Sequence, residues 1–145
     1  MNQNVSEEWV ELRTRAMALL QEEANLEEIV RLVGIDALSE GDRLKLEVAK
    51  SIREDYLMQN AFHDVDTYSS LDKQYRMLKL VLSFQDEAER ALKSGVYLNK
   101  IISMGEIRDK IARAKYIPET DLDKIDAIGE ELRKAIDKLI AEEGV

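Results

Sequence analysis

The 145-residue sequence contains no cysteine, a single proline and only six glycines. The lack of cysteine excludes disulfide bonds and cysteine-based metal sites. The scarcity of proline and glycine, together with 35% charged residues, favours helices along the whole chain. No apolar run approaches the ~20 residues of a membrane-spanning helix, and the polar N-terminus lacks a secretory signal pattern. We therefore expect a soluble, cytoplasmic helical domain.

Motifs of several enzyme classes are also missing. The sequence has no Gly-x-x-x-x-Gly-Lys-Ser/Thr loop to hold phosphates, no His-Glu-x-x-His motif and no Gly-x-Ser-x-Gly motif. The net charge of −9 would repel the phosphates of nucleic acid. The only histidine, His63, stands near Asp64 and Asp66, which is too small a ligand set to define a metal site. We expect no catalytic residue, no metal site and no nucleic-acid partner.

The sequence does contain a series of helical patterns. The clearest predicts a helix from about Glu40 to Met58, with Ser39 and Asp42 forming its N-cap. Apolar residues recur every four positions along its buried face at Leu44, Val48, Ile52 and Tyr56. We expect this helix to be a stiff rod of roughly 25 Å.

Helices are predicted on both sides of this rod. We expect them over 6–24, 26–33, 70–94 and 120–142, with two short pieces between 96 and 114. Asn25 and Glu28 predict a new helix start, and Gly34 predicts the end of that helix. The segment before Pro118 is expected to be extended. Residues 70–94 form the longest predicted helix, and their wide apolar stripe places it at the centre of the bundle. The predicted fold is all-α: a compact bundle of about six helices over residues 6–145, preceded by loose residues 1–5.

Several stretches resemble the catalytic subunit of A-type and V-type rotary ATPases. DALSEGDRLKLEVAKSI, which begins at Asp36, resembles the DELSEED segment of rotary catalytic subunits, and DYLMQNAF resembles the loop that ends the same helix. AMALLQEEANLEEIVRLVGID, FHDVDTYSSLDKQYRMLKLVLSF and IARAKYIPE extend the resemblance over nearly the whole chain. It implies an excised C-terminal helical domain, with the nucleotide-binding P-loop domain absent from this chain.

The resemblance implies that the acidic turn faces the rotating central stalk. The residues in those positions are Asp36, Leu38, Glu40 and Asp42. Gly41 replaces a glutamate of the DELSEED pattern, so no charge is expected there. In the alternative interpretation, Ser39 and Asp42 stabilise the helix start and the other acids are simply solvated; both interpretations can hold at once. Exposed ion pairs are each worth only ~0–1 kcal/mol, which suits a sliding contact better than a latch.

At the other end of the rod, the resemblance implies that Phe62 helps to form an adenine pocket, with Asn60 and Ala61 as adjacent lining. Burial of Phe62 under its loop is the alternative that its residue type favours. Met58 stands where the family has glutamine, so a hydrogen bond from that side chain is not expected. One stacked aromatic is worth ~1–3 kcal/mol, below the ~4.1 kcal/mol of millimolar affinity. We therefore expect no measurable ATP binding by this chain alone.

The function implied by the resemblance is mechanical coupling in a proton-translocating ATP synthase. The parent catalytic subunit would be the enzyme and would hold ATP or ADP with magnesium, whereas this chain would hold no cofactor. Its partners would be the remainder of the catalytic subunit, the non-catalytic subunit of the same ring, and the central stalk, in a cytoplasmic complex peripheral to the membrane. The alternative is a free-standing helical adaptor that binds partner helices without nucleotide, and a peptide-binding groove would favour it.

Overall fold

The computed structural model describes residues 3–57 and 70–144, with side chains from Glu7 onward. Within these ranges the chain forms six α-helices and no strand: α1 Gln3–Val33, α2 Glu40–Ser51, α3 Leu71–Lys93, α4 Leu98–Ile102, α5 Gly105–Arg113 and α6 Asp123–Glu143. Four shorter helical turns accompany them: η1 Ile35–Ala37, the π-helical η2 Ile52–Leu57, η3 Ala114–Tyr116 and η4 Glu119–Asp121. The predicted all-α bundle of about six helices is confirmed.

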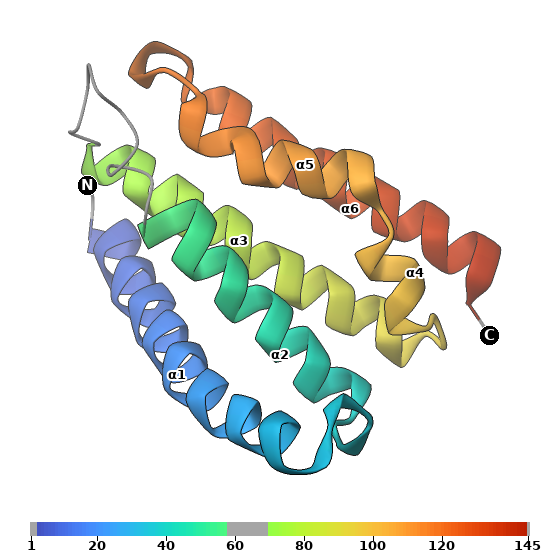
Figure 1. Ribbon diagram of the computed structural model, residues 1–145. Coiled ribbons are helices and arrows are strands. Elements are labelled where there is room, and N and C mark those ends of the chain that lie inside the picture. Colours follow the sequence, from blue (N-terminus) through green and yellow to red (C-terminus); the bar gives the residue numbers. More distant parts are fainter. Residues whose placement is uncertain (1–2, 58–69, 145) are drawn as a thin grey trace.

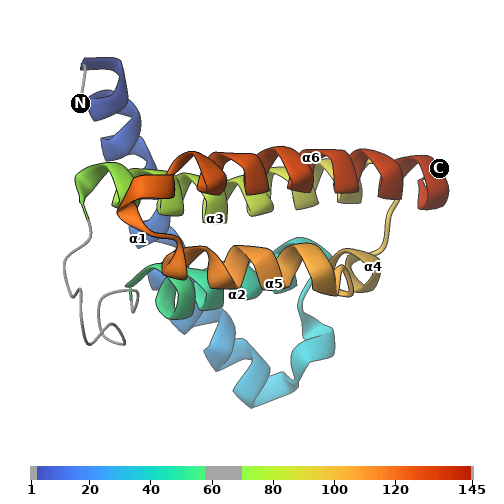
Figure 2. The same ribbon diagram turned by 90° about the horizontal axis from the view of Figure 1, so that it is seen from above.

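Helix α3 runs through the middle of the bundle (Figures 1 and 2). It packs against α1 and α2 on one side and against α6 on the other. Its buried side chains include Met77, Leu78, Leu82 and Phe84, each at most 3% exposed. The central position predicted from the wide apolar stripe of this helix is therefore confirmed.

Helix α1 differs from the prediction, because it is one continuous helix of 31 residues. The expected break at Asn25 is wrong, and α3, with 23 residues, is shorter than α1. The physical reason lies in the buried stripe of α1, whose members are spaced three and four residues apart: Leu12, Ala16, Leu19, Glu23 and Leu26. This stripe passes through the Asn25 region without changing phase, so packing against α2 and α3 outweighs the capping tendency of asparagine.

Helix α2 begins as predicted, because the Ser39 hydroxyl oxygen accepts a hydrogen bond from the backbone N–H of Asp42 at 3.1 Å. On its predicted face, Leu44, Val48 and Ile52 are fully inaccessible to solvent, whereas Tyr56 is only partly buried. The last six residues, Ile52–Leu57, continue the helix in π geometry instead of α geometry. The rod is thus helical from Glu40 to Leu57, and the predicted end at Met58 lies outside the described residues.

In the C-terminal third, one prediction is confirmed and one is corrected. The break between two short helices near Gly105 is confirmed, since α4 ends at Ile102 and α5 begins at Gly105. The segment before Pro118 is only partly extended, because Ala114–Tyr116 forms a 3-10 turn. A methyl group added at Gly129 in α6 would lie 3.9 Å from Leu80 Cδ1, which is an ordinary contact.

Different chain turns lie at the two ends of the bundle (Figures 1 and 2). One end carries the start of α1, the end of η2, the start of α3 and the α5–α6 connection. The opposite end carries the α1–α2 turn, the α3–α4 turn and the end of α6. The predicted acidic turn and the helix end that leads into residue 58 therefore lie at opposite ends of the molecule.

Candidate functional site

The acidic turn between α1 and α2 is built on one glycine and one buried leucine. Gly34 has a φ of 92°, a conformation that favours glycine, and its N–H closes α1 by donating to the Val30 carbonyl at 2.8 Å. After η1 the Leu38 side chain points inward and is only 6% exposed. Leu38 was predicted to be a stalk contact. In this structure its side chain is buried, so little of it is available to a partner at the outer surface.

The carboxylates of Asp36 and Asp42 have partners on the same stretch of chain. Asp36 is 97% exposed, and its Oδ1 lies 3.1 Å from Arg43 Nη2. Asp42 Oδ1 lies 3.8 Å from Lys45 Nζ. A hydrogen bond to Glu22 is the main cause that raises the pKa of Lys45, and the charge of Asp42 adds to it. A basic partner would have to compete with these internal ion pairs.

Glu40 is an exposed residue, but its carboxylate contacts α4. Its Oε2 accepts a hydrogen bond from the backbone N–H of Leu98 at 2.6 Å, across 58 residues of sequence. Leu98 is the first residue of α4, and the side chain of the preceding residue, Tyr97, makes no capping hydrogen bond in the described chain. Glu40 therefore takes the place of a helix cap for α4 and ties the α1–α2 turn to the α3–α4 turn.

Sequence reasoning missed the apolar side chains on the outside of this turn. Four of them are unusually exposed and define what we call the apolar tip: Ile29 (40%), Leu32 (70%), Val33 (68%) and Ile35 (45%). Adjacent exposed apolar side chains are typical of contact surfaces. The signal was present in the run IVRLVGI, which holds more apolar residues than one helix face can bury.

The predicted adenine edge lies outside the described residues, which stop at Leu57 and resume at Ser70. Asn60, Ala61 and Phe62 all belong to that interval, as does the histidine considered as a metal ligand. Within the described ranges, no group of three or more histidine, aspartate or glutamate side chains could hold a metal ion. The adenine edge therefore stays a prediction.

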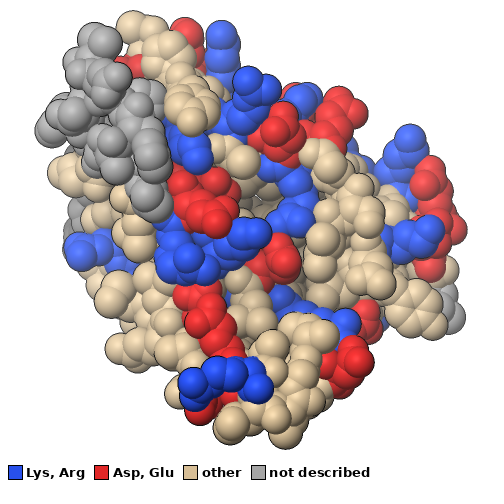
Figure 3. Space-filling model, viewed as in Figure 1, with Lys and Arg blue, Asp and Glu red and all other residues tan. Residues whose placement is uncertain are grey.

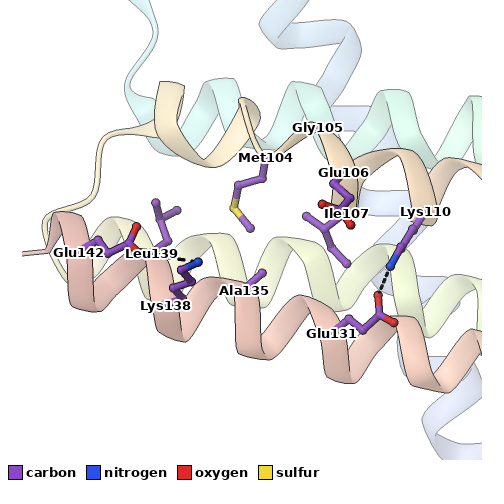
Figure 4. A pocket seen from close by; sticks show the side chains of 10 residues that line it. All are labelled: Met104, Gly105, Glu106, Ile107, Lys110, Glu131, Ala135, Lys138, Leu139 and Glu142. Atoms are coloured by element: carbon purple, nitrogen blue, oxygen red, sulfur yellow. Dashed lines mark hydrogen bonds and ion pairs between the residues drawn. The ribbon is translucent and has the colours of Figure 1, made fainter.

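The described surface shows other features that bear on function. Basic and acidic side chains alternate across the face seen in Figure 3, so this face has no extended patch of one sign. A groove of about 430 Å³ lies between α5 and α6 (Figure 4), lined on its apolar side by Met104, Ile107 and Leu139. Lys110 Nζ and Glu131 Oε2 form a 2.8 Å ion pair across it. None of the described helices has the length and apolarity needed to span a bilayer.

Comparison with known proteins identifies the family. Residues 1–102 match the family described as the C-terminal domain of V and A type ATP synthase. The chain belongs to this family. Over all 145 residues it is 85% identical to the V-type ATP synthase alpha chain of Clostridium novyi (strain NT) and 70% identical to the V-type ATP synthase alpha chain 1 of Clostridium tetani (strain Massachusetts / E88).

A third relative, the V-type ATP synthase alpha chain of Clostridium perfringens (strain SM101 / Type A), is 66% identical over the same 145 residues. Each of these matches covers 100% of this chain but 24% of the relative. The chain thus spans about a quarter of the length of these curated relatives. The resemblance inferred from the DALSEGD and DYLMQNAF segments is confirmed at the level of the family.

Proposed function

We propose that this chain is the coupling domain of the catalytic subunit in a proton-translocating V/A-type ATP synthase. Nucleotide-driven changes in the rest of the catalytic subunit swing the bundle, and the turn between α1 and α2 presses on the central stalk. Rotation driven by proton flow acts through the same bundle in the direction of ATP synthesis. ATP or ADP with magnesium binds in the parent catalytic subunit, which assembles with the non-catalytic subunit of the ring, and with the stalk, on the cytoplasmic side of the membrane.

The single observation that carries this proposal is the apolar tip at the outermost turn of the bundle. Fully burying one aliphatic side chain is worth about 1.5–3 kcal/mol, so covering the exposed 70% of Leu32 is worth about 1–2 kcal/mol. An exposed ion pair contributes only ~0–1 kcal/mol. The acids of the turn are also already paired with Arg43 and Lys45. We infer that the stalk contact is made mainly by packing and that charge plays the smaller part.

The second part of the proposal concerns the opposite end of the rod. Phe62, with Asn60 and Ala61 beside it, forms the adenine edge of the nucleotide site in the parent protein. The support for this assignment is the family membership together with the direction of the chain, which leaves the end of η2 at the end of the bundle far from the α1–α2 turn. A stiff α2, packed on α3 through Leu44 and Val48, then links the two contacts.

Rotation in the assembled ATPase tests the stalk contact. The variant Leu32→Gln/Val33→Gln removes apolar character from side chains that are exposed in this structure, so the bundle should still fold. We expect ATP hydrolysis to continue while ATP-driven rotation and proton pumping fall. The matched control is Val10→Gln/Met17→Gln, which makes the same change at exposed apolar residues of α1 away from the turn.

A charge-neutralised variant separates packing from electrostatics. Asp36→Asn/Glu40→Gln/Asp42→Asn removes three charges but keeps an oxygen on residue 40 for the Leu98 N–H. We expect coupling to remain nearly intact in this variant. Strong uncoupling by the charge variant, combined with normal coupling in Leu32→Gln/Val33→Gln, would show that the contact depends on charge and that the packing argument is wrong.

The adaptor alternative depends on the groove between α5 and α6. Its α5 side runs from Met104 to Lys110, seven residues that span roughly 10 Å of helix. A stable protein interface buries about 800 Å² on each partner, which requires several helical turns. The Lys110–Glu131 ion pair also crosses the groove and would have to open. The short α5 side of the groove therefore disfavours a helix-binding adaptor.

A further inference from the structure

The turn between α3 and α4 carries an exposed tyrosine at the same end of the bundle as the apolar tip. Both turns lie at this end in Figures 1 and 2. Tyr97 is 74% exposed, which makes it the most exposed large apolar or aromatic side chain in the described part of the chain. It belongs to neither the acidic turn nor the apolar tip, so the stalk contact described so far leaves its exposure unexplained.

The backbone around Tyr97 holds this side chain in an outward direction. Val96 and Leu98 are each only 2% exposed, and the backbone at Tyr97 is extended, with φ −74° and ψ 145°. Successive side chains of an extended chain point to opposite sides, so burial of the two neighbours leaves Tyr97 pointing away from the core. Just before this stretch, Gly95 has a φ of 91°, and the Val96 N–H donates to the Ala91 carbonyl oxygen at 3.1 Å. The turn is therefore a closed helix end and not a loose loop.

Two other helices contact the same turn. Glu40, the first residue of α2, accepts the N–H of Leu98 at 2.6 Å. The end of α6 also approaches closely, because a methyl group on Gly144 would lie 3.0 Å from the Ser94 carbonyl oxygen. The α3–α4 turn is thus held by α2 and by the end of α6. A displacement of the start of α2 therefore carries Tyr97 with it.

A rigidly held, exposed tyrosine is well suited to a protein contact. Tyrosine offers a large contact area with few side-chain torsions to immobilise, and it is enriched among the residues that dominate binding energy. A turn that is already ordered loses little entropy on binding. The only charged residues over positions 93–100 are Lys93 and Lys100, and both are exposed. The partner surface that fits this turn is therefore an apolar patch bordered by acidic side chains.

We propose that Tyr97 is a second anchor for the central stalk, so that the stalk-facing surface consists of two turns: the apolar tip and the α3–α4 turn. This inference rests on the proposed stalk contact at the apolar tip. The hydrogen bond from Leu98 to Glu40 joins the two turns, since it links the residue after Tyr97 to the first residue of α2. A bundle that touches the stalk at one turn can pivot about that point, whereas a second anchor on another turn fixes its orientation.

Photo-cross-linking in the assembled ATPase identifies what Tyr97 contacts. The photoreactive amino acid p-benzoylphenylalanine replaces Tyr97 or, in separate samples, Val33 of the apolar tip or Val10 on the outer side of α1. Val33 and Val10 are similarly exposed, at 68% and 62%, so Val10 is the matched control. We expect a product with a stalk subunit from positions 97 and 33, and none from position 10.

The two proposals fail in different ways in this experiment. A product from position 97 with a neighbouring ring subunit or a second copy of this chain, or no product, overturns the second anchor. A stalk product from position 33 in the same series would leave the proposed function standing. Absence of a stalk product from position 33 contradicts the contact at the apolar tip, whatever position 97 shows.

Coupling measurements show whether the contact acts in rotation. Tyr97→Ser removes an exposed ring and leaves the bond between Leu98 and Glu40 in place, whereas Tyr97→Phe keeps the ring. We expect Tyr97→Ser to lose proton pumping relative to ATP hydrolysis, and Tyr97→Phe and the control Val10→Ser to match wild type. Wild-type coupling in Tyr97→Ser, or an equal loss in Tyr97→Phe or Val10→Ser, would overturn a packing contact at Tyr97.

Discussion

Replacing Glu40 tests whether this residue belongs to the interior or to a contact surface. In the wild type its carboxylate accepts the N–H of Leu98, a residue that is only 2% exposed. Leaving a buried donor without a partner costs about 1–3 kcal/mol, and hydrogen bonds to charged groups lie in the upper half of that range. Glu40 itself is exposed, so solvent screens this contact and the expected cost falls in the lower half of the range. We therefore expect Glu40→Ala to lower the free energy of unfolding by about 1–1.5 kcal/mol.

The assay is urea unfolding followed by circular dichroism, where the midpoint should fall without a change in slope. For a chain of this size the loss corresponds to a decrease of about 2–6 °C in Tm. Glu40→Gln keeps a neutral acceptor and should lose about half as much. Asp36→Ala, which removes the most exposed acid of the turn, is the control and should be indistinguishable from wild type. If Glu40→Ala and Asp36→Ala changed the free energy of unfolding equally, the reasoning would be refuted, and Glu40 would be an ordinary surface charge.

Two further predictions concern stability. Gly129→Ala should stabilise the bundle by about 1 kcal/mol, because the added methyl group meets only Leu80 Cδ1 at 3.9 Å and alanine favours the helix; a lower Tm would reveal a tighter contact than the structure shows. For Asp55, burial raises the pKa of the carboxyl in the folded protein above its ordinary value of 3.8. The protonated carboxyl therefore contributes stability that is fully present below pH 3.8 and is lost as the pH rises through the pKa of the folded protein. The stability of Asp55→Asn relative to wild type should therefore increase between pH 3.5 and 7.5, and a constant difference would contradict the assigned cause.

The parts of the fold that sequence predicted are those governed by local periodicity. Leu44, Val48 and Ile52 are buried because their spacing matches one helix face, and the Ser39 cap forms because its acceptor lies three residues from its donor. The false break at Asn25 shows the limit of local rules. A capping residue ends a helix only when the buried stripe also ends there, and in α1 that stripe continues.

The π turn at Ile52–Leu57 could not be predicted, because it shifts the register of a short helical stretch by less than one residue per turn. The apolar pattern of Ile52 and Tyr56 fits α and π geometry almost equally well. The shift nevertheless decides where Asp55 lies, and so determines that a charged residue is 9% exposed beside Lys115 instead of facing solvent. Long-range partners of this kind are set by tertiary packing and leave no pattern in neighbouring residues.

In the candidate site, too, local features could be predicted from the sequence, whereas long-range contacts could not. The acids of the turn were found from a motif, but their pairing was not, since Glu40 and Leu98 are 58 residues apart. The hydrogen bond between Ser70 and Glu119 joins residues 49 positions apart, so the sequence pattern could not predict it either. The apolar tip could have been found, because the run from Ile29 to Ile35 exceeds what one face can bury. The prediction for this turn was based on its acidic residues and did not include these apolar side chains.

The rod formed by α2 and η2 is held at both ends by elements remote in sequence. Glu40 ties its first turn to α4, and Asp55 ties its last turn to Lys115 in the connection between α5 and α6. Between these ties, Val48 and Ile52 are fully buried in the core shared with α3. A force on the α1–α2 turn cannot slide this rod along its axis without breaking both ties and repacking that core, and closely packed interiors resist such repacking. For the proposed coupling function, we therefore expect the bundle to move as one body, so that a displacement at the apolar tip would reach the end of η2 through the whole bundle and not through α2 alone.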